Sequence, residues 1–110
     1  MKNNFKISII TVTKNSENFL EENIKSLSNQ THKNFEHIII DGKSTDNTLE
    51  ICSSFSHIKK IISEKDNGVY DAFNKGIACA EGDIIGFLNS DDVYHNSKSL
   101  DLIVQNFNDN

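Results

Sequence analysis

The chain has no proline, only two cysteines and five glycines, and no long apolar run. Its longest apolar stretches, such as Ile38–Ile40, are far too short to span a bilayer, and its first residues carry no signal-peptide pattern. Cys52 and Cys79 lie in separate helix candidates without CxxC spacing, which favours two buried, reduced thiols over a disulfide. We therefore expect a cytoplasmic protein, with attachment to the inner face of a membrane through other parts as an alternative.

Clusters of basic residues are absent as well. The net charge of -5 and the isoelectric point near 5.2 argue against a nucleic-acid-binding surface, which requires a basic stripe. At 110 residues, with 36% hydrophobic and 25% charged residues, the chain is long enough for one soluble α/β domain and short for a complete enzyme of that type.

Two kinds of apolar pattern alternate along the chain. Runs of β-branched and aromatic residues predict strands at Phe5–Thr13, Phe35–Ile40, Ile58–Ile62 and Asp83–Leu88. Apolar residues at helical spacing predict helices around 19–27, 49–55, 69–80 and 100–107. This βαβαβαβα order predicts an α/β fold, namely a three-layer, Rossmann-like, mostly parallel sheet with helices on both faces.

Short polar signals predict how the helices begin and end. Asn18 and Glu21 are spaced as a loose capping box for the first helix. Ser44–Asp46 offer side-chain oxygens that could cap the second helix. Gly82 stands where a helix C-cap favours a positive φ.

Polar residues follow each expected strand at the point where it ends. They are Thr13–Asn15, Asp41–Ser44, Glu64–Gly68 and Asn89–Asp92. Because the carboxyl ends of parallel strands meet at one edge of a sheet, we expect these loops to line a single ligand-binding edge. Asn89–Asp92 taken alone would equally suit an Asx-rich turn that stops the strand, and the other three loops favour a site.

Glycine-rich phosphate motifs are missing from this edge. Val12–Asn15 contains no glycine, so the first loop lacks the GxGxxG of a dinucleotide-binding domain, and GxxxxGK[ST] occurs nowhere. Acidic loops suggest instead a metal that bridges protein carboxylates to a diphosphate, and carboxylate oxygens suit Mg²⁺ or Mn²⁺. All four histidines are interpreted as partly exposed polar residues, and His95 alone lies close enough behind Asp91 and Asp92 in the sequence to approach the metal.

Five segments carry a resemblance to a known family. They are Ile7–Asn15, Ser28–Thr31, Ile40–Asp46, Glu64–Ile77 and Gly82–Asp92. In this order and with these spacings they resemble family 2 glycosyltransferases of the GT-A fold, most closely the bacterial surface-polysaccharide branch. Because the resemblance covers nearly the whole chain, it implies that residues 1–110 are a single nucleotide-sugar-binding domain, the N-terminal portion of a longer enzyme.

The resemblance implies a nucleotide site. Asp41 resembles the family aspartate that accepts a hydrogen bond from the nucleotide base, usually uracil. Thr13 and Lys14 lie where the first loop of the family contacts the nucleotide. Four further residues occupy the stretch that borders the nucleotide and diphosphate, namely Asp66, Asp71, Asn74 and Lys75.

The resemblance also implies a metal site. Asn89 stands where many members have the first acid of their Asp-x-Asp motif, and its amide oxygen can ligate a metal or hydrogen-bond a ribose. Asp91 and Asp92 would then hold Mg²⁺ or Mn²⁺, which assists departure of the nucleoside diphosphate.

The implied reaction is inverting transfer of a sugar from a nucleotide-diphosphate sugar, with UDP favoured, to a saccharide or lipid-linked acceptor hydroxyl in surface polysaccharide synthesis. In this family the general base follows the metal site, so we expect it after Asn110. Asp101 and Asp109 are interpreted as surface charges. We therefore expect this chain to bind the donor without completing the transfer. The alternatives are a nucleotidyltransferase and a non-catalytic nucleotide-binding or interaction module of α/β type.

Overall fold

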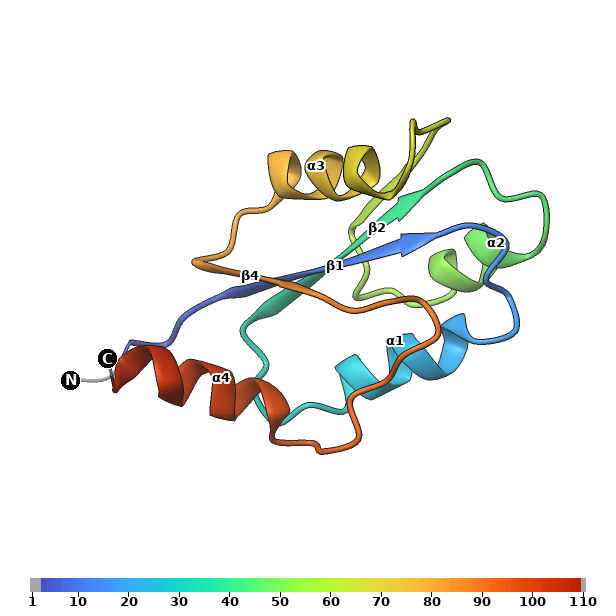
Figure 1. The fold of residues 1–110 in the computed structure, drawn as a ribbon. Helices are drawn as coiled ribbons and strands as arrows, with labels where there is room; N and C mark the ends of the chain where they lie inside the picture. The colour runs from blue at the N-terminus through green and yellow to red at the C-terminus, as the bar shows by residue number, and fades with distance from the viewer. Residues whose placement is uncertain (1–2, 110) are drawn as a thin grey trace.

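Strands and helices alternate throughout the computed structural model, which describes residues 3–109 (Figure 1). In chain order these are β1 (Ile7–Thr13), α1 (Leu20–Ser28), β2 (Phe35–Asp41), α2 (Thr48–Ser53), β3 (Lys60–Ser63), α3 (Val69–Cys79), β4 (Ile84–Phe87) and α4 (Ser99–Asn108). The strands form one sheet in the order β3-β2-β1-β4, and every neighbouring pair is parallel. The predicted α/β class with a parallel sheet is confirmed.

Helices cover both faces of the sheet, as predicted. In Figure 1, α3 lies on one side of the strands, and α1, α2 and α4 lie on the other. Successive side chains of a strand point to opposite faces, so Ile9 of β1 packs in the cluster that contains Leu27 and Leu100, while Ile10 packs with Ala72 of α3. This explains why the central strands read as continuous β-branched runs.

The predicted capping signals are only partly right. The first helix begins at Leu20, and no side chain caps it; the Ser16 carbonyl accepts the Leu20 N–H instead, so the Asn18–Glu21 capping box is wrong. For the second helix, the Asp46 carboxylate accepts the Thr48 N–H at 2.9 Å, as the polar run predicted, although the N-cap residue itself is Asn47.

Gly82 is explained by close packing and not by backbone conformation. Gly68 is the one glycine with a positive φ among the described residues, so the predicted positive φ of Gly82 is wrong. A Cβ on Gly82 would lie 2.6 Å from Ser8 Oγ and 2.8 Å from the Lys6 carbonyl oxygen. A larger residue would therefore push the connection between α3 and β4 away from β1.

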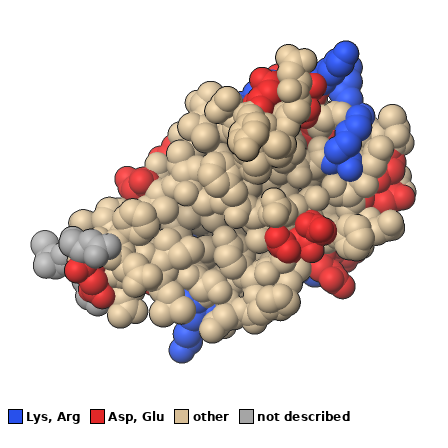
Figure 2. Space-filling model, in the orientation of Figure 1, with Lys and Arg blue, Asp and Glu red and all other residues tan. Residues whose placement is uncertain are grey.

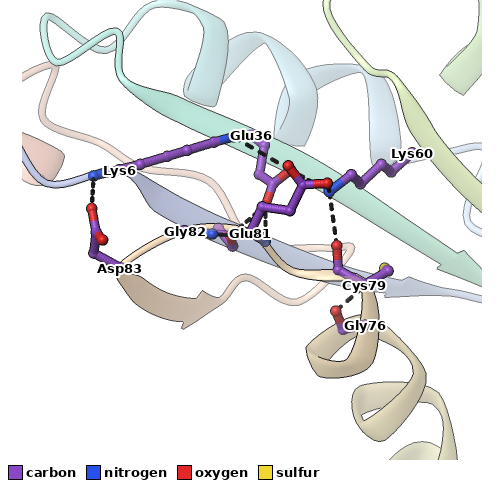
Figure 3. A network of polar contacts seen from close by, with 9 residues as sticks. Lys6, Glu36, Lys60, Gly76, Cys79, Glu81, Gly82 and Asp83 are labelled. Atoms are coloured by element: carbon purple, nitrogen blue, oxygen red, sulfur yellow. Dashed lines mark hydrogen bonds and ion pairs between the residues drawn. The ribbon is translucent and has the colours of Figure 1, made fainter.

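A polar network joins the strands at the end of the sheet opposite the polar loops (Figure 3). The Glu36 carboxylate pairs with Lys60 at 2.8 Å, accepts the Ser8 hydroxyl at 2.5 Å and accepts the Glu81 N–H at 2.7 Å. Burial alone would raise the pKa of Glu36, but the hydrogen bonds from Lys60 and Ser8 outweigh it and lower that pKa to about 2. The network joins the N-terminal parts of β1, β2 and β3 to the connection between α3 and β4.

The cysteines and histidines depart in part from the predictions. Cys52 is a buried free thiol, and burial raises its pKa to about 12; Cys79 is also free but only half-buried. His32 and His37 are buried, so the prediction that they are partly exposed is wrong, whereas His57 is exposed. Burial lowers the pKa of His37 to about 3.

None of the helices within residues 3–109 has both the length and the apolar character needed to cross a membrane.

Candidate functional site

The four polar loops meet at the carboxyl edge of the sheet. Lys14, after β1, donates from Nζ to the Gly42 carbonyl oxygen, after β2, at 2.6 Å. Gly42 in turn lies against the loop after β3, because a Cβ on it would stand 2.8 Å from Asp66 Oδ2. The Ser16 hydroxyl reaches the loop after β4, where it donates to Ser90 Oγ at 3.2 Å. The chain therefore brings together the loops in which the candidate residues lie.

The first two loops are interlocked by side chain to backbone hydrogen bonds. The Asn15 N–H donates to Ser44 Oγ, and Asn15 Oδ1 accepts the Thr45 N–H, both at 2.8 Å. Asn15 and Lys43 have φ values of 49° and 57°, a left-handed conformation that is uncommon for residues other than glycine. Backbone in this conformation persists where surrounding contacts enforce it and is concentrated at functional sites.

Asp41 is the polar centre of this edge. Its side chain is fully buried, and its two oxygens accept four hydrogen bonds, which fill the acceptor sites of a carboxylate. The donors are Thr13 Oγ1 at 2.6 Å, Ser44 Oγ at 2.5 Å, the Ser44 N–H at 2.8 Å and Ser63 Oγ at 2.8 Å.

These contacts join the ends of β1, β2 and β3 through one side chain. Burial alone would raise the pKa of Asp41, but the hydrogen bonds from Ser44 and Thr13 outweigh it and lower that pKa, so the group is a carboxylate. A nucleotide base could reach its oxygens only by displacing one of these donors. The predicted contact between Asp41 and a base stays a prediction.

A hollow of about 410 Å³ lies between the first three loops, within the range of small-molecule sites. It is lined by Val12, Thr13, Lys14, Gly42, Lys65, Asp66 and Val69. Three of these, Thr13, Lys14 and Asp66, are predicted site residues. The apolar side chains of Val12 and Val69 add surfaces on which a flat ring could rest, and no sequence motif pointed to them.

The other predicted residues of the third loop and α3 lie outside the lining of this hollow. Asp71 accepts the Asn67 N–H at 3.0 Å and pairs with Lys75 at 3.3 Å, and these contacts lower its pKa. Lys75 also pairs with Glu64 at 3.1 Å, and Asn74 is exposed on α3. Asp71 and Lys75 thus brace the loop that carries Asp66.

The acidic residues lie in a tight turn directly after β4. The Asp92 N–H donates to the Asn89 carbonyl oxygen at 2.9 Å and closes the turn, and Asn89 Nδ2 donates to Asp92 Oδ2 at 3.2 Å. Asn89, Asp91 and Asp92 are all exposed. Asn23 of α1, which sequence reasoning missed, contacts the backbone of this turn; its one sequence signal is a polar residue in an apolar helical stripe.

The donor atoms available in this turn are of the kind that binds a cation which a ligand also coordinates. Among residues 3–109, no three acidic, histidine or cysteine side chains form a metal-binding group. Two carboxylates, Asp91 and Asp92, and the Asn89 amide oxygen are hard ligands. Mg²⁺ is usually held in this way, by one or two carboxylates together with substrate phosphates and water.

Charges of both signs surround the edge. Figure 2 shows basic (blue) and acidic (red) side chains close together on the right-hand half of the molecule, where the loops after the strands lie in Figure 1. Such a mixture suits a ligand that combines an anionic group with a bound cation.

His95 lies on a different surface. It is exposed and lines a second hollow of about 450 Å³ between α1 and residues 93–97, together with Glu22, Lys25 and Tyr94. This places its side chain beside α1 and outside the lining of the hollow between the first three loops, and its approach to the metal stays a prediction.

Comparison with known proteins identifies the family. The model of the family described as "Glycosyl transferase family 2" matches residues 8–110. The chain belongs to glycosyltransferase family 2. This membership favours the glycosyltransferase interpretation over the nucleotidyltransferase alternative.

Two relatives show how much of a family 2 protein the chain represents. The Rickettsia conorii protein "Uncharacterized glycosyltransferase RC0461" is 43% identical over 98 residues, which are 87% of this chain and 16% of that protein. The Bacillus subtilis "Putative teichuronic acid biosynthesis glycosyltransferase TuaG" is 33% identical over 96 residues, 84% of this chain and 38% of that protein. The chain therefore spans well under half of either relative.

A solved structure confirms the GT-A fold of this family 2 chain. The crystal structure of S. aureus TarS residues 1–349 in complex with UDP-GlcNAc superposes with a TM-score of 0.84 at 30% identity. The match covers 91% of this chain and 30% of the TarS chain.

Proposed function

We propose that residues 1–110 form the donor-binding domain of a glycosyltransferase that uses a nucleotide-diphosphate sugar and a divalent cation. The observation that carries this proposal is the junction of four loops at one sheet edge, where Thr13, Lys14 and Asp66 line a hollow and Ser16 contacts the acidic turn through Ser90. Family membership supports this chemistry for the edge.

The nucleotide would occupy the hollow between the first three loops. Val12 and Val69 offer apolar contact to a base, and Lys14 and Lys65 offer positive charge to an anionic ligand. Asp41 would act by holding the loop ends in place, and a base that reached it would replace one of its hydroxyl donors. Binding of UDP-GlcNAc by TarS supports UDP as the nucleotide.

Asp91 and Asp92, with Asn89, would hold Mg²⁺ or Mn²⁺. When bound, the metal supplies Lewis-acid stabilisation of the leaving nucleoside diphosphate. The protein carboxylates repel a diphosphate, so the cation is also needed to bring the two together. Lys75 and Asp71 would support the site from α3 by bracing the loop of Asp66.

The acceptor would be a saccharide or lipid-linked hydroxyl in surface polysaccharide synthesis, which the name of TuaG supports. Transfer would invert the anomeric configuration, with a carboxylate base from a segment after Asn110 removing the acceptor proton. Residues 1–110 would then bind the donor without completing the reaction.

Calorimetric titration with UDP tests the proposal. We expect binding in the presence of Mn²⁺, at least tenfold weaker binding after chelation, and the same weakening in Asp91→Asn and Asp92→Asn. Because both carboxylates are exposed, these variants should melt close to the wild-type chain. If the affinity for UDP changes neither on removal of Mn²⁺ nor in the two variants, the metal site is contradicted. If no binding is detected at millimolar UDP, the nucleotide site is contradicted as well.

A further inference from the structure

One polar residue interrupts the buried face of α1. Leu20, Ile24 and Leu27 form an apolar stripe on this face, and Asn23 lies within it, fully buried. Burying an amide costs free energy unless it is hydrogen-bonded, and an apolar residue here would simply continue the stripe. The role of Asn23 must therefore be sought in what its side chain contacts.

Its contacts lie at both ends of the acidic turn. Asn23 Nδ2 donates to the Asn89 carbonyl oxygen at 2.9 Å and to the Asp92 carbonyl oxygen at 3.0 Å. These two bonds use both N–H groups of the amide. Asn23 Oδ1 is buried without a partner among the described residues, so the side chain acts through its nitrogen alone.

The turn is held by its backbone, and its acidic side chains stay accessible to a ligand, with one oxygen of Asp92 accepting a hydrogen bond from Asn89 Nδ2 at 3.2 Å. Besides Asn23, the Ile10 carbonyl oxygen accepts the Leu88 N–H at 3.1 Å directly before the turn. Asp91 and Asp92 are nevertheless exposed. A preorganised metal site requires surrounding groups that hold its ligands in position. Here the backbone of the turn is fixed, and its carboxylates point outward.

We propose that Asn23 is a positioning residue, which holds the Asn89–Asp92 turn in the orientation that lets Asp91 and Asp92 bind the divalent cation. This inference rests on the metal site of the proposed function. Asn23 itself contributes no metal ligand, because its amide oxygen, the atom that could ligate, is buried, and its amide nitrogen is directed at the two backbone carbonyls.

Gln30 supplies a matched control. It is also buried and follows α1, and its side chain also contacts backbone. Nε2 donates to the Asn96 carbonyl oxygen at 2.9 Å and to the Ser26 carbonyl oxygen at 3.2 Å, and Oε1 accepts the Leu100 N–H at 3.1 Å. These contacts hold the segment that leads into α4 and not the acidic turn. Asn23→Leu and Gln30→Met thus each replace a buried amide side chain that bonds backbone by an apolar side chain of similar volume. The first removes contacts to the acidic turn, and the second removes contacts to the segment before α4.

Two readouts test the proposal on the 110-residue chain, namely the Kd for Mn²⁺ alone and the hydrogen-exchange rate of the Asp92 amide without metal. Both variants should melt at a lower temperature. Asn23→Leu should raise the Kd for Mn²⁺ about tenfold and speed exchange of the Asp92 amide, while Gln30→Met changes neither. Asn23→Ser keeps one hydroxyl donor and should give intermediate values, and it replaces Asn23→Leu if that variant does not fold.

The possible failures are distinguishable. Wild-type affinity for Mn²⁺ and an unchanged Asp92 exchange rate in Asn23→Leu or Asn23→Ser would overturn the role of Asn23 and leave the metal site intact. If the wild-type chain instead binds Mn²⁺ no better than Asp91→Asn and Asp92→Asn, the proposed metal site fails, and the role of Asn23 fails with it.

Discussion

Replacement of Asp41 should separate its charge from its hydrogen-bonding geometry. Asp41→Ala removes the acceptor of four hydrogen bonds and leaves the Ser44 N–H without its partner. At about 1 kcal/mol net for each bond, the loss is about 4 kcal/mol. For a domain of this size that corresponds to a fall in melting temperature of roughly 20 °C.

Asp41→Asn should be far milder. The amide has the same shape, and it can orient its oxygen toward the Ser44 N–H and Ser63 Oγ and its nitrogen toward Thr13 Oγ1 and Ser44 Oγ, since a hydroxyl can accept as well as donate. Only the strength added by the charge is lost, about 1 kcal/mol. The expected fall in melting temperature is roughly 5 °C.

The difference in stability between the wild-type chain and Asp41→Asn should become smaller as the pH falls. Because the folded-state pKa of Asp41 is lowered, its charge stabilises the fold above the unfolded-state pKa, and this stabilisation is lost as the pH falls through the folded-state pKa. Thermal melts between pH 7 and pH 3 measure it. Asp83→Asn is the control, because Asp83 is exposed and accepts one bond from the Lys6 N–H. Equal melting temperatures for Asp41→Ala and Asp41→Asn would refute the four-bond interpretation.

Two further substitutions test other parts of the structure. Glu36→Gln should remove the stability that the charge of Glu36 provides, which is present above pH 4.5 and lost as the pH falls toward 2. The lowered pKa of Glu36 sets this loss at about 3 kcal/mol at most. Urea unfolding at pH 7 and pH 3 measures it, and an equal loss of stability at both pH values would contradict its ionic origin. Gly42→Ala places a Cβ 2.8 Å from Asp66 Oδ2 and should displace that carboxylate, weakening UDP binding with little change in melting temperature; unchanged UDP affinity would show that Asp66 does not contact the nucleotide.

The fold could be predicted because its signals are local. The run Ile7–Val12 is β-branched on both faces, and this pattern suits a strand covered by helices on each side. The apolar stripe that begins at Val69 likewise predicted a helix over 69–80, and α3 ends one residue earlier, at Cys79. Features set by tertiary packing were not predictable: position 82 requires a glycine because it packs against Ser8, far away in the sequence.

The candidate site was predictable as a set of loops and not as a set of contacts. The position of Asp41 after a strand placed it at the sheet edge. The hydrogen bonds that fill its carboxylate, however, come from hydroxyl groups at three strand ends, which only folding brings together. Asp71 and Lys75 share a motif with Asp66, yet they pair with each other one helical turn apart. Asn23 was missed because a single polar residue in an apolar stripe carries no motif.

Paramagnetic broadening by Mn²⁺ in an NMR spectrum of the labelled chain locates the metal and nucleotide on the structure. With UDP present, substoichiometric Mn²⁺ should broaden the amide signals of residues 89–92 first and those of Thr13, Lys14 and Asp66 next, and Asp91→Asn with Asp92→Asn should abolish the effect. Broadening centred on the Lys6, Glu36 and Glu81 end of the sheet, or broadening that survives the double substitution, would contradict a donor site at the carboxyl edge.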